Sequence, residues 1–158
     1  MKGDKQIIEI LNEVLTAELT AINQYFVHAE MCENWGFDRL VKVVRKHSIG
    51  EMKHAEEVIE RILFLEGIPN VQRLGKINLG ENVPEMLKLD YQLELEALPR
   101  LNKGIEVCRE LGDNNSRHLL EKILHDEEEH VDWIEAQLSL IEQVGAQNYL
   151  AQQIKEEE

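Results

Sequence analysis

The sequence predicts an all-α fold, an antiparallel four-helix bundle with a long crossover between the second and third helices and a short fifth C-terminal helix. Apolar residues recur at spacings of three and four rather than two, and glycine and proline cluster in few places. Four such segments are each roughly thirty residues long and would extend about 45 Å as helices. Helices of matched length pack well side by side as a bundle.

The first two helices are expected over about residues 5–34 and 38–66, separated by the short turn NWGFD. Gly67 and Pro69 follow the second helix and predict its C-terminal stop. Because the turn between them is short, these two helices should form an antiparallel hairpin.

A long crossover is expected over residues 68–82, which have no helical period. Asn82 and Glu85 resemble a capping box, and Pro84 suits the first turn of a third helix that continues to about Leu111. A connection of this length can span the bundle from one end to the other.

The remaining chain completes the pattern. A fourth helix is expected over about residues 115–144 and ends at Gly145, and the segment QNYLAQQIKE forms a short fifth helix before an acidic tail. Two hairpins joined by one long crossover make the ferritin-like arrangement. The length fits one domain that covers residues 1–158.

Composition and charge narrow the classes of partner. The chain is 43% hydrophobic and 30% charged, as in soluble globular proteins, and its wholly apolar runs are too short to span a membrane. The stretch MKGDKQIIEI has no apolar signal-peptide region, so we expect a cytoplasmic protein. A net charge of -14 argues against nucleic acid and anionic membranes and would attract cations. Cys32 and Cys108 suggest neither a disulfide framework nor a thiolate metal site.

Carboxylates and imidazoles interrupt the apolar stripes of the expected helices. Two Glu-x-x-His motifs lie on such stripes, and each follows another stripe glutamate by the same 33 residues. The two halves therefore read as an internal repeat with an offset of 76 residues. The first set is Glu18, Glu51 and His54, and the second is Glu94, Glu127 and His130.

These residue types indicate a buried metal centre. Residues three apart on a helix share a face, so each Glu-x-x-His pair can offer an oxygen and a nitrogen to one centre. Four unpaired buried carboxylates would repel one another unless divalent cations compensated them. Four carboxylates with two imidazoles suit two iron or manganese ions, and this is the ligand pattern of ferritin-like di-iron and di-manganese proteins.

Other polar residues fit simpler roles. Tyr25 lies on the stripe of Glu18, where we interpret it as a core residue, with a role as a nearby electron or hydrogen-bond donor left open. Glu128 and Glu129 are expected on a solvated face. Four histidines without matching partners are expected to be structural or surface residues: His28, His47, His118 and His125.

The chain also resembles the bacterioferritin family over essentially its whole length. The resemblance rests on MKGDKQIIEILN, AINQYFVHAEM, NWGFDRL, IGEMKHAEEVIERILFLEGIPN, DEEEHVDWIE and QNYLAQQI. It implies a cage of twenty-four like subunits that oxidises Fe²⁺ with O₂ or H₂O₂ and stores ferric mineral. It further implies the ligand roles, with Glu18 and His54 on one iron, Glu94 and His130 on the other, and Glu51 and Glu127 bridging.

The same resemblance implies a second cofactor and one departure. The family binds haem b between two-fold-related subunits through a methionine that corresponds to Met52, and a small ferredoxin is the implied electron donor. Many relatives carry His and Asp, which can bind an extra iron on the inner face, where this chain has Lys46 and Gly50. Neither replacement is a useful ligand at neutral pH, so the departure argues against an inner-face iron relay of that kind.

Two alternatives to an iron-storing ferroxidase stay open at this point. One is a di-iron redox enzyme that acts on an organic or peroxide substrate without storing iron. The other is a haem-binding shell subunit that works beside a different catalytic subunit. The absence of a Cys-x-x-Cys motif argues against a rubrerythrin-like peroxidase, and the complete six-residue set argues against a purely structural shell subunit.

Overall fold

The computed structural model describes residues 1–154, and these contain helices and no strand. The predicted bundle is confirmed, with four long helices and a short C-terminal one. The last two residues of the predicted fifth helix, the acidic tail and the end of the single domain expected over 1–158 lie outside the described residues. No helix of the described part is long and apolar enough to cross a membrane. The helices are α1 (Lys5–Trp35), α2 (Asp38–Phe64), α3 (Val83–Glu110), α4 (Asn114–Val144) and α5 (Ala146–Ala151).

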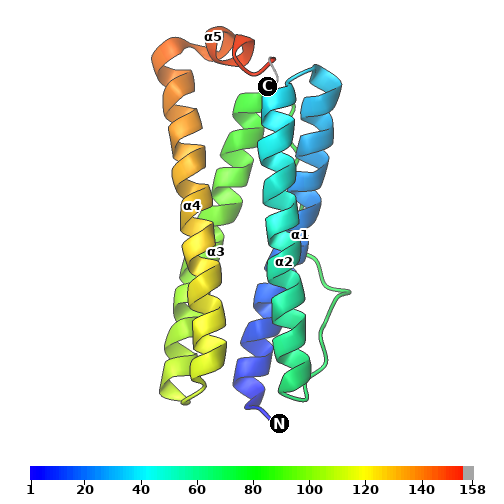
Figure 1. Ribbon diagram of the computed structural model, residues 1–158, viewed down its shortest axis with the longest axis vertical. Helices are drawn as coiled ribbons and strands as arrows, with labels where there is room; N and C mark the ends of the chain where they lie inside the picture. The colour runs from blue at the N-terminus through cyan, green and yellow to red at the C-terminus, as the bar shows by residue number, and fades with distance from the viewer. Residues whose placement is uncertain (155–158) are drawn as a thin grey trace.

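The long helices form two hairpins that lie side by side. α1 packs mainly against α2 and α3 packs mainly against α4, each pair being joined by a short turn. The crossover runs along the outside of the bundle from the end of α2 to the start of α3, so α2 and α3 run in the same direction (Figure 1). α5 lies across the end of the bundle beyond α4 (Figure 1).

Side-chain caps define the starts of three long helices, α1, α3 and α4. Asp4 accepts the backbone N–H of Gln6 at 2.8 Å at the start of α1. Asn82 accepts the N–H of Glu85 at 2.9 Å at the start of α3, which confirms the predicted cap. Each of these bonds satisfies a backbone donor that the first turn of a helix leaves without an intrahelical partner.

The end of α2 differs from the prediction. The helix stops at Phe64, and Glu66 rather than Gly67 adopts the left-handed conformation, with φ of 62°. The N–H of Gly67 then reaches back to the carbonyl of Ile62 at 2.9 Å. Gly67 is needed for space, because a Cβ there would lie 2.8 Å from Cγ2 of Ile8. The helix therefore ends two residues before the predicted end at residue 66, and Gly67 lies in the turn that follows it.

Replacing Glu66 with glycine should therefore stabilise the protein by about 0.5–1 kcal/mol, because glycine adopts a positive φ without the steric cost that other residues incur. The contact of Glu66 with the N-terminal amine is long, at 3.6 Å, and exposed, so its loss should matter little. Thermal unfolding at fixed protein concentration measures the effect. Glu60→Gly, at an exposed position inside α2, is the matched control and should lower the midpoint.

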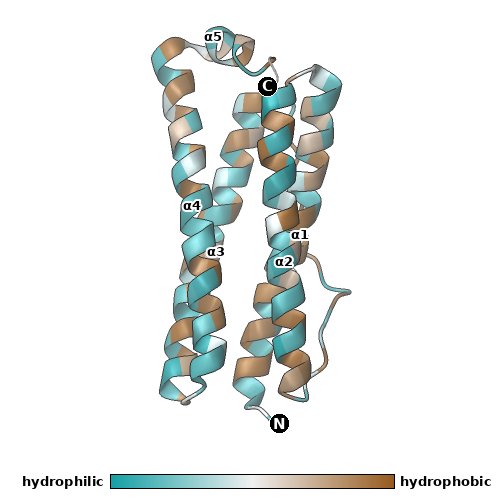
Figure 2. Ribbon diagram, viewed as in Figure 1, coloured by the Kyte–Doolittle hydropathy of each residue, from teal (hydrophilic) through white to brown (hydrophobic). Residues whose placement is uncertain are grey.

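Two separate apolar clusters fill the bundle. One lies toward the start of α1 and includes Leu11, Leu15 and Ile62, and the other lies toward its end and includes Tyr25, Val44 and Leu87. Figure 2 shows hydrophobic and hydrophilic segments alternating along every long helix, as one buried face requires. On each helix the buried acidic residues of the predicted sets fall between the two clusters. The middle of the bundle is therefore a polar layer between two apolar ones.

Candidate metal centre

The polar layer consists of the six residues that the sequence singled out. α1 and α3 each supply one glutamate, and α2 and α4 each supply a Glu-x-x-His pair. Five of these residues are buried, with exposed fractions of 1–5%, and His130 is half-buried. Helical geometry explains the convergence, because positions three apart project from one face toward the bundle axis. The buried five are Glu18, Glu51, His54, Glu94 and Glu127.

The histidines face the carboxylates through Nδ1. Nδ1 of His54 lies 3.2 Å from Oε1 of Glu127, 3.5 Å from Oε2 of Glu51 and 3.6 Å from Oε2 of Glu18. Nδ1 of His130 lies 3.1 Å from Oε1 of Glu51 and 3.8 Å from Oε2 of Glu127. It also lies 3.5 Å from Oε1 of Glu94.

The six residues form two overlapping groups of four ligand atoms, each group lying within 4.8 Å. Glu51 and Glu127 belong to both groups. A carboxylate that belongs to two adjacent sites has an oxygen for each, which is what a bridging ligand requires. The first group adds Glu18 and His54, and the second adds Glu94 and His130.

Each of the six side chains also carries a buried polar atom without a hydrogen-bond partner among the described residues. Buried polar atoms are normally satisfied, so six such atoms aimed into one layer need an explanation. Carboxylate oxygens and imidazole nitrogens are ligands that iron and manganese accept. The donor set therefore fits a pair of metal ions. The atoms are Oε2 of Glu18, Oε1 of Glu51, Nδ1 of His54, Oε2 of Glu94, Oε1 of Glu127 and Nδ1 of His130.

Crowding of the carboxylates changes their affinity for protons. Burial, and next the charge of Glu51, raises the pKa of Glu18 well above its ordinary value. Burial, and next the charge of Glu127, raises the pKa of Glu94 to about 8. Burial would raise the pKa of Glu51 as well, but its close contacts with Glu18 and both histidines lower it to about 2. Crowding therefore favours proton uptake by Glu18 and Glu94.

The same neighbouring carboxylates raise the pKa of both histidines. Burial alone would lower the pKa of His130, but its close contacts with the carboxylates of Glu51 and Glu94 raise it to about 10. The pKa of His54 is raised in the same way by Glu127, Glu18 and Glu51, against the effect of burial. In the metal-free centre protons are therefore favoured on several of the atoms that a metal ion would need. Metal ions must displace these protons, so metal affinity should fall as pH falls and rise with pH through neutrality.

Aromatic residues surround the second group. Tyr25 is buried and its hydroxyl donates a hydrogen bond to Oε1 of Glu94, so it is both a core residue and a hydrogen-bond donor. The ring of His47 lies against the ring of His130, with centroids 4.3 Å apart, and its centroid lies 5.1 Å from that of Trp133 in an edge-to-face arrangement. His47 was expected to be structural or on the surface, and it is a half-buried packing partner of the centre.

The sequence did not identify Asp126 as part of this site. Its Oδ2 lies 2.7 Å from Nε2 of His54, on the opposite side of the imidazole from the carboxylate layer. Asp126 directly precedes Glu127, and its side chain is partly exposed. The sequence signal for Asp126 is the 76-residue repeat offset. It makes Asp126 equivalent to position 50, which lies next to Glu51 and is occupied by Gly50.

A second buried polar group, also missed from the sequence, attaches the crossover to the bundle. Nδ1 of His28 lies 2.8 Å from Oδ1 of Asp90, and Nε2 of His28 accepts the backbone N–H of Gly80 at 3.0 Å. Gln24 donates to the same oxygen of Asp90 and accepts the N–H of Asn78 at 3.1 Å. Both ring nitrogens of His28 are used in this network, so His28 has the structural role that was expected of it.

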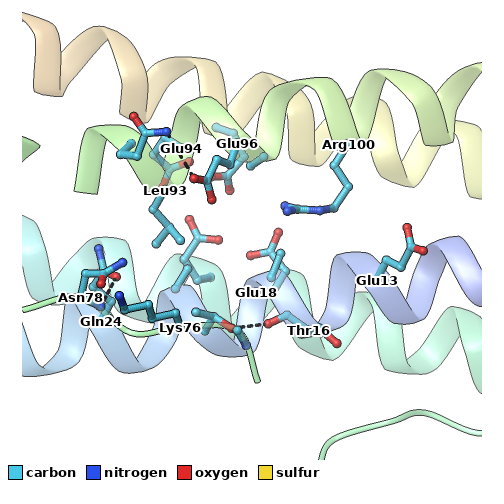
Figure 3. A pocket seen from close by; sticks show the side chains of 18 of the residues that line it. Glu13, Thr16, Glu18, Gln24, Lys76, Asn78, Leu93, Glu94, Glu96 and Arg100 are labelled. Carbon is cyan, nitrogen blue, oxygen red and sulfur yellow. Dashed lines mark hydrogen bonds between the residues drawn. The ribbon is translucent and has the colours of Figure 1, made fainter. Parts of the chain in front are cut away.

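A cavity of about 450 Å³ adjoins the centre between α1, α3 and the crossover. All four carboxylates of the centre are among its lining residues. Figure 3 shows Glu18 and Glu94 projecting toward each other across this space, while Arg100 reaches in from α3. The cavity can hold small hydrated ions next to the four carboxylates.

The other singled-out residues lie away from the layer. Met52 is 53% exposed, on a different face of α2 from its neighbour Glu51. Lys46 is also exposed, and Gly50 carries no donor atom. The remaining singled-out residues are exposed, as expected: Glu128, Glu129, His118 and His125.

Comparisons with known proteins agree with this architecture. A family model described as the ferritin-like domain matches residues 8–144. The bacterioferritin of Mycobacterium leprae is 50% identical over 152 residues, which cover 96% of each chain. The bacterioferritin of Streptomyces coelicolor is 50% identical over 99% of this chain and 93% of its own, and that of Brucella melitensis is 42% identical over 94% and 92%. Over nearly its whole length, this four-helix chain with its layer of carboxylates and histidines belongs to the bacterioferritin family of ferritin-like proteins.

Proposed function

We propose that the protein stores and detoxifies iron, oxidising Fe²⁺ to Fe³⁺ at the candidate metal centre and keeping the ferric product inside a cage of its own copies. The observation that carries this proposal is the set of six unsatisfied donor atoms, one from each of the six residues, gathered in one buried layer. The names of the related bacterioferritins support iron as the metal.

In this proposal Glu18 and His54 hold one Fe²⁺, and Glu94 and His130 hold the other. Glu51 and Glu127 bridge them, in line with their place in both ligand groups. Each Fe²⁺ gives up one electron, and the pair reduces one H₂O₂ with two protons to two waters, or one O₂ with two protons to H₂O₂. The protons that the ligands lose when iron binds are available for this reduction.

The surrounding residues act on the ligands rather than on iron. The hydrogen bond from Tyr25 holds Glu94 in place, and Asp126 does the same for His54. The cavity beside α3 and the crossover gives ions access to the carboxylates. The two apolar clusters keep bulk water away from both ends of the layer.

We further propose that the copies assemble as a 24-subunit cage with haem b at two-fold interfaces. The fit of Met52 to this role rests on its exposed thioether and on Ile49, which lies three residues earlier on the same face and is 47% exposed. When bound, haem b supplies an iron that takes up and passes on single electrons, and a small ferredoxin is the proposed donor. Met52 and its counterpart in a second copy would hold the haem iron.

Anaerobic titration of the metal-free protein with Fe²⁺ tests the proposal. We expect binding to saturate at about two ions per subunit and to release protons, and added O₂ or H₂O₂ should then oxidise the bound iron rapidly. Gel filtration should show a large assembly rather than a monomer or dimer. Binding that saturates at one ion or none, or slow oxidation of the bound pair, would contradict the proposal.

A further inference from the structure

The 76-residue repeat relates the two halves of the metal centre, but it does not make them equal. It pairs Glu18 with Glu94, Glu51 with Glu127 and His54 with His130. The same offset pairs Gly50 of α2 with Asp126 of α4. Asp126 contacts Nε2 of His54, so by the same relation the residue at position 50 is the one that should contact Nε2 of His130. That residue is a glycine and has no side chain.

The contact with Asp126 prepares His54 to bind metal. Nε2 of His54 lies 2.7 Å from the carboxylate of Asp126, so the N–H of this nitrogen is donated there. When the proton of the neutral ring is on Nε2, the lone pair that can bind a metal ion is on Nδ1. Nδ1 is the nitrogen that faces the three glutamates. A carboxylate behind a metal-binding histidine fixes the ring and makes it a stronger donor.

His130 has no comparable support. Among residues 1–154, no hydrogen bond joins its Nε2 to another residue, and its ring is held by packing against His47. Ring contact restrains the plane of an imidazole, but it neither selects which nitrogen carries the proton nor increases donor strength. His47 itself has Ile123 as its counterpart in the repeat, so the packing is also specific to this half.

The terminal glutamates differ in the same direction. The hydroxyl of Tyr25 donates a hydrogen bond to Oε1 of Glu94, and this draws electron density away from that carboxylate. The repeat counterpart of Tyr25 is Leu101, which has no hydroxyl to donate to Glu18. The hydrogen bond from Tyr25 therefore takes up part of the charge of Glu94, and no tyrosine does this for Glu18.

We propose that the two metal positions are unequal, with the Glu18/His54 position filling first and binding more tightly, and that Asp126 and Gly50 are the residues that set this order. The proposal rests on the proposed function, since it concerns the order in which the same centre takes up its two ions. Asp126 is a positioning residue in this scheme, because it acts through His54.

Titration of the metal-free protein with Co²⁺, followed by calorimetry and by the visible absorption of the bound ion, tests the proposal without any turnover. We expect two binding steps in the wild-type protein, separated by at least about tenfold in affinity. In crystals prepared with one Co²⁺ per subunit, anomalous scattering should locate the ion mainly between Glu18 and His54.

Two variants should move the steps in opposite ways. Asp126→Ala should weaken the tighter step by about 10–100-fold and leave the weaker step nearly unchanged. Gly50→Asp should tighten the weaker step by about tenfold, because a Cβ at position 50 meets nothing within 4 Å and a carboxylate there can be accommodated. Glu128→Ala, at an exposed neighbouring carboxylate, and Gly50→Asn, which adds similar bulk without charge, are the matched controls.

Equal occupancy of the two positions at one equivalent of Co²⁺ would overturn the proposal. So would an Asp126→Ala variant that weakens both steps alike, or a Gly50→Asp variant that tightens binding no more than Gly50→Asn does. Each of these results would leave the proposed two-metal centre standing. Failure of Co²⁺ to bind at either position would instead overturn the proposed function together with this inference.

Discussion

Glu127→Ala should abolish the rapid phase of Fe²⁺ oxidation, and Glu51→Ala should do the same. Each substitution removes a carboxylate that belongs to both ligand groups, so neither iron keeps its full set of donors and the pair is no longer held together. Loss of a residue that merely supports a ligand costs about 10–100-fold, and loss of a bridging ligand should cost more than about 100-fold in rate. Stopped-flow absorbance after mixing Fe²⁺ with metal-free protein and oxidant measures this rate.

Glu128→Ala is the matched control for this experiment. It removes a carboxylate from the next position of α4, where the side chain is exposed, and should keep the wild-type rate. Circular dichroism and gel filtration should show that fold and assembly survive in all three variants, since Glu51→Ala and Glu127→Ala relieve repulsion in the metal-free layer and Glu128 is exposed. A Glu127→Ala protein that oxidises iron at the wild-type rate would refute the assignment of the centre.

Met52→Leu should lose haem completely while it keeps wild-type iron uptake. Leucine has a similar volume but no sulphur to bind haem iron, and each proposed two-fold interface would lose both residues that would hold the haem. Met52 projects away from the buried layer, so the six donor atoms should be unaffected. Haem content per subunit, measured by the absorption of the reconstituted protein, should fall from about one per two subunits to none.

Reductive release separates the two roles further. In the proposed cage electrons would have to reach ferric iron inside the shell, so we expect release with an external one-electron donor to slow in Met52→Leu. Met31→Leu is the control. It removes a half-buried thioether from a different helix, α1, and should bind haem and release iron normally. If Met52→Leu bound haem as the wild type does, Met52 would not be the ligand. If it failed to oxidise iron although folded and assembled, the separation between the functions of Glu51 and Met52 would be wrong.

Helical periodicity predicted most of the fold and the membership of the polar layer. Glu18 and Glu94 could be found because each occupies a position of an apolar stripe that a carboxylate rarely takes, and because the same spacing recurs in both halves. The cap at Asn82 could be found because capping depends on neighbours within one turn. Signals of this kind are local, or repeat at a fixed interval.

The features that sequence reasoning missed depend on contacts between separate helices. Asp126 meets His54 across the α2–α4 interface, and His28 meets Asp90 and the backbone of Gly80 from a third segment. No spacing rule within one helix connects such residues. The conformation of Glu66 was missed for a related reason, since the position of Gly67 is set by its approach to Ile8 of another helix.

The polar layer between the two apolar clusters also bears on the cooperativity of unfolding. In the metal-free protein the two apolar clusters are connected mainly by the helices that pass between them. The carboxylates of the polar layer repel one another and so add little stability there. Ligands from all four long helices would meet at a bound pair of ions, so opening either end would strain the other. Metal loading should thus merge two partly independent folding units into one, and the apoprotein should open locally at its ends before the whole bundle unfolds.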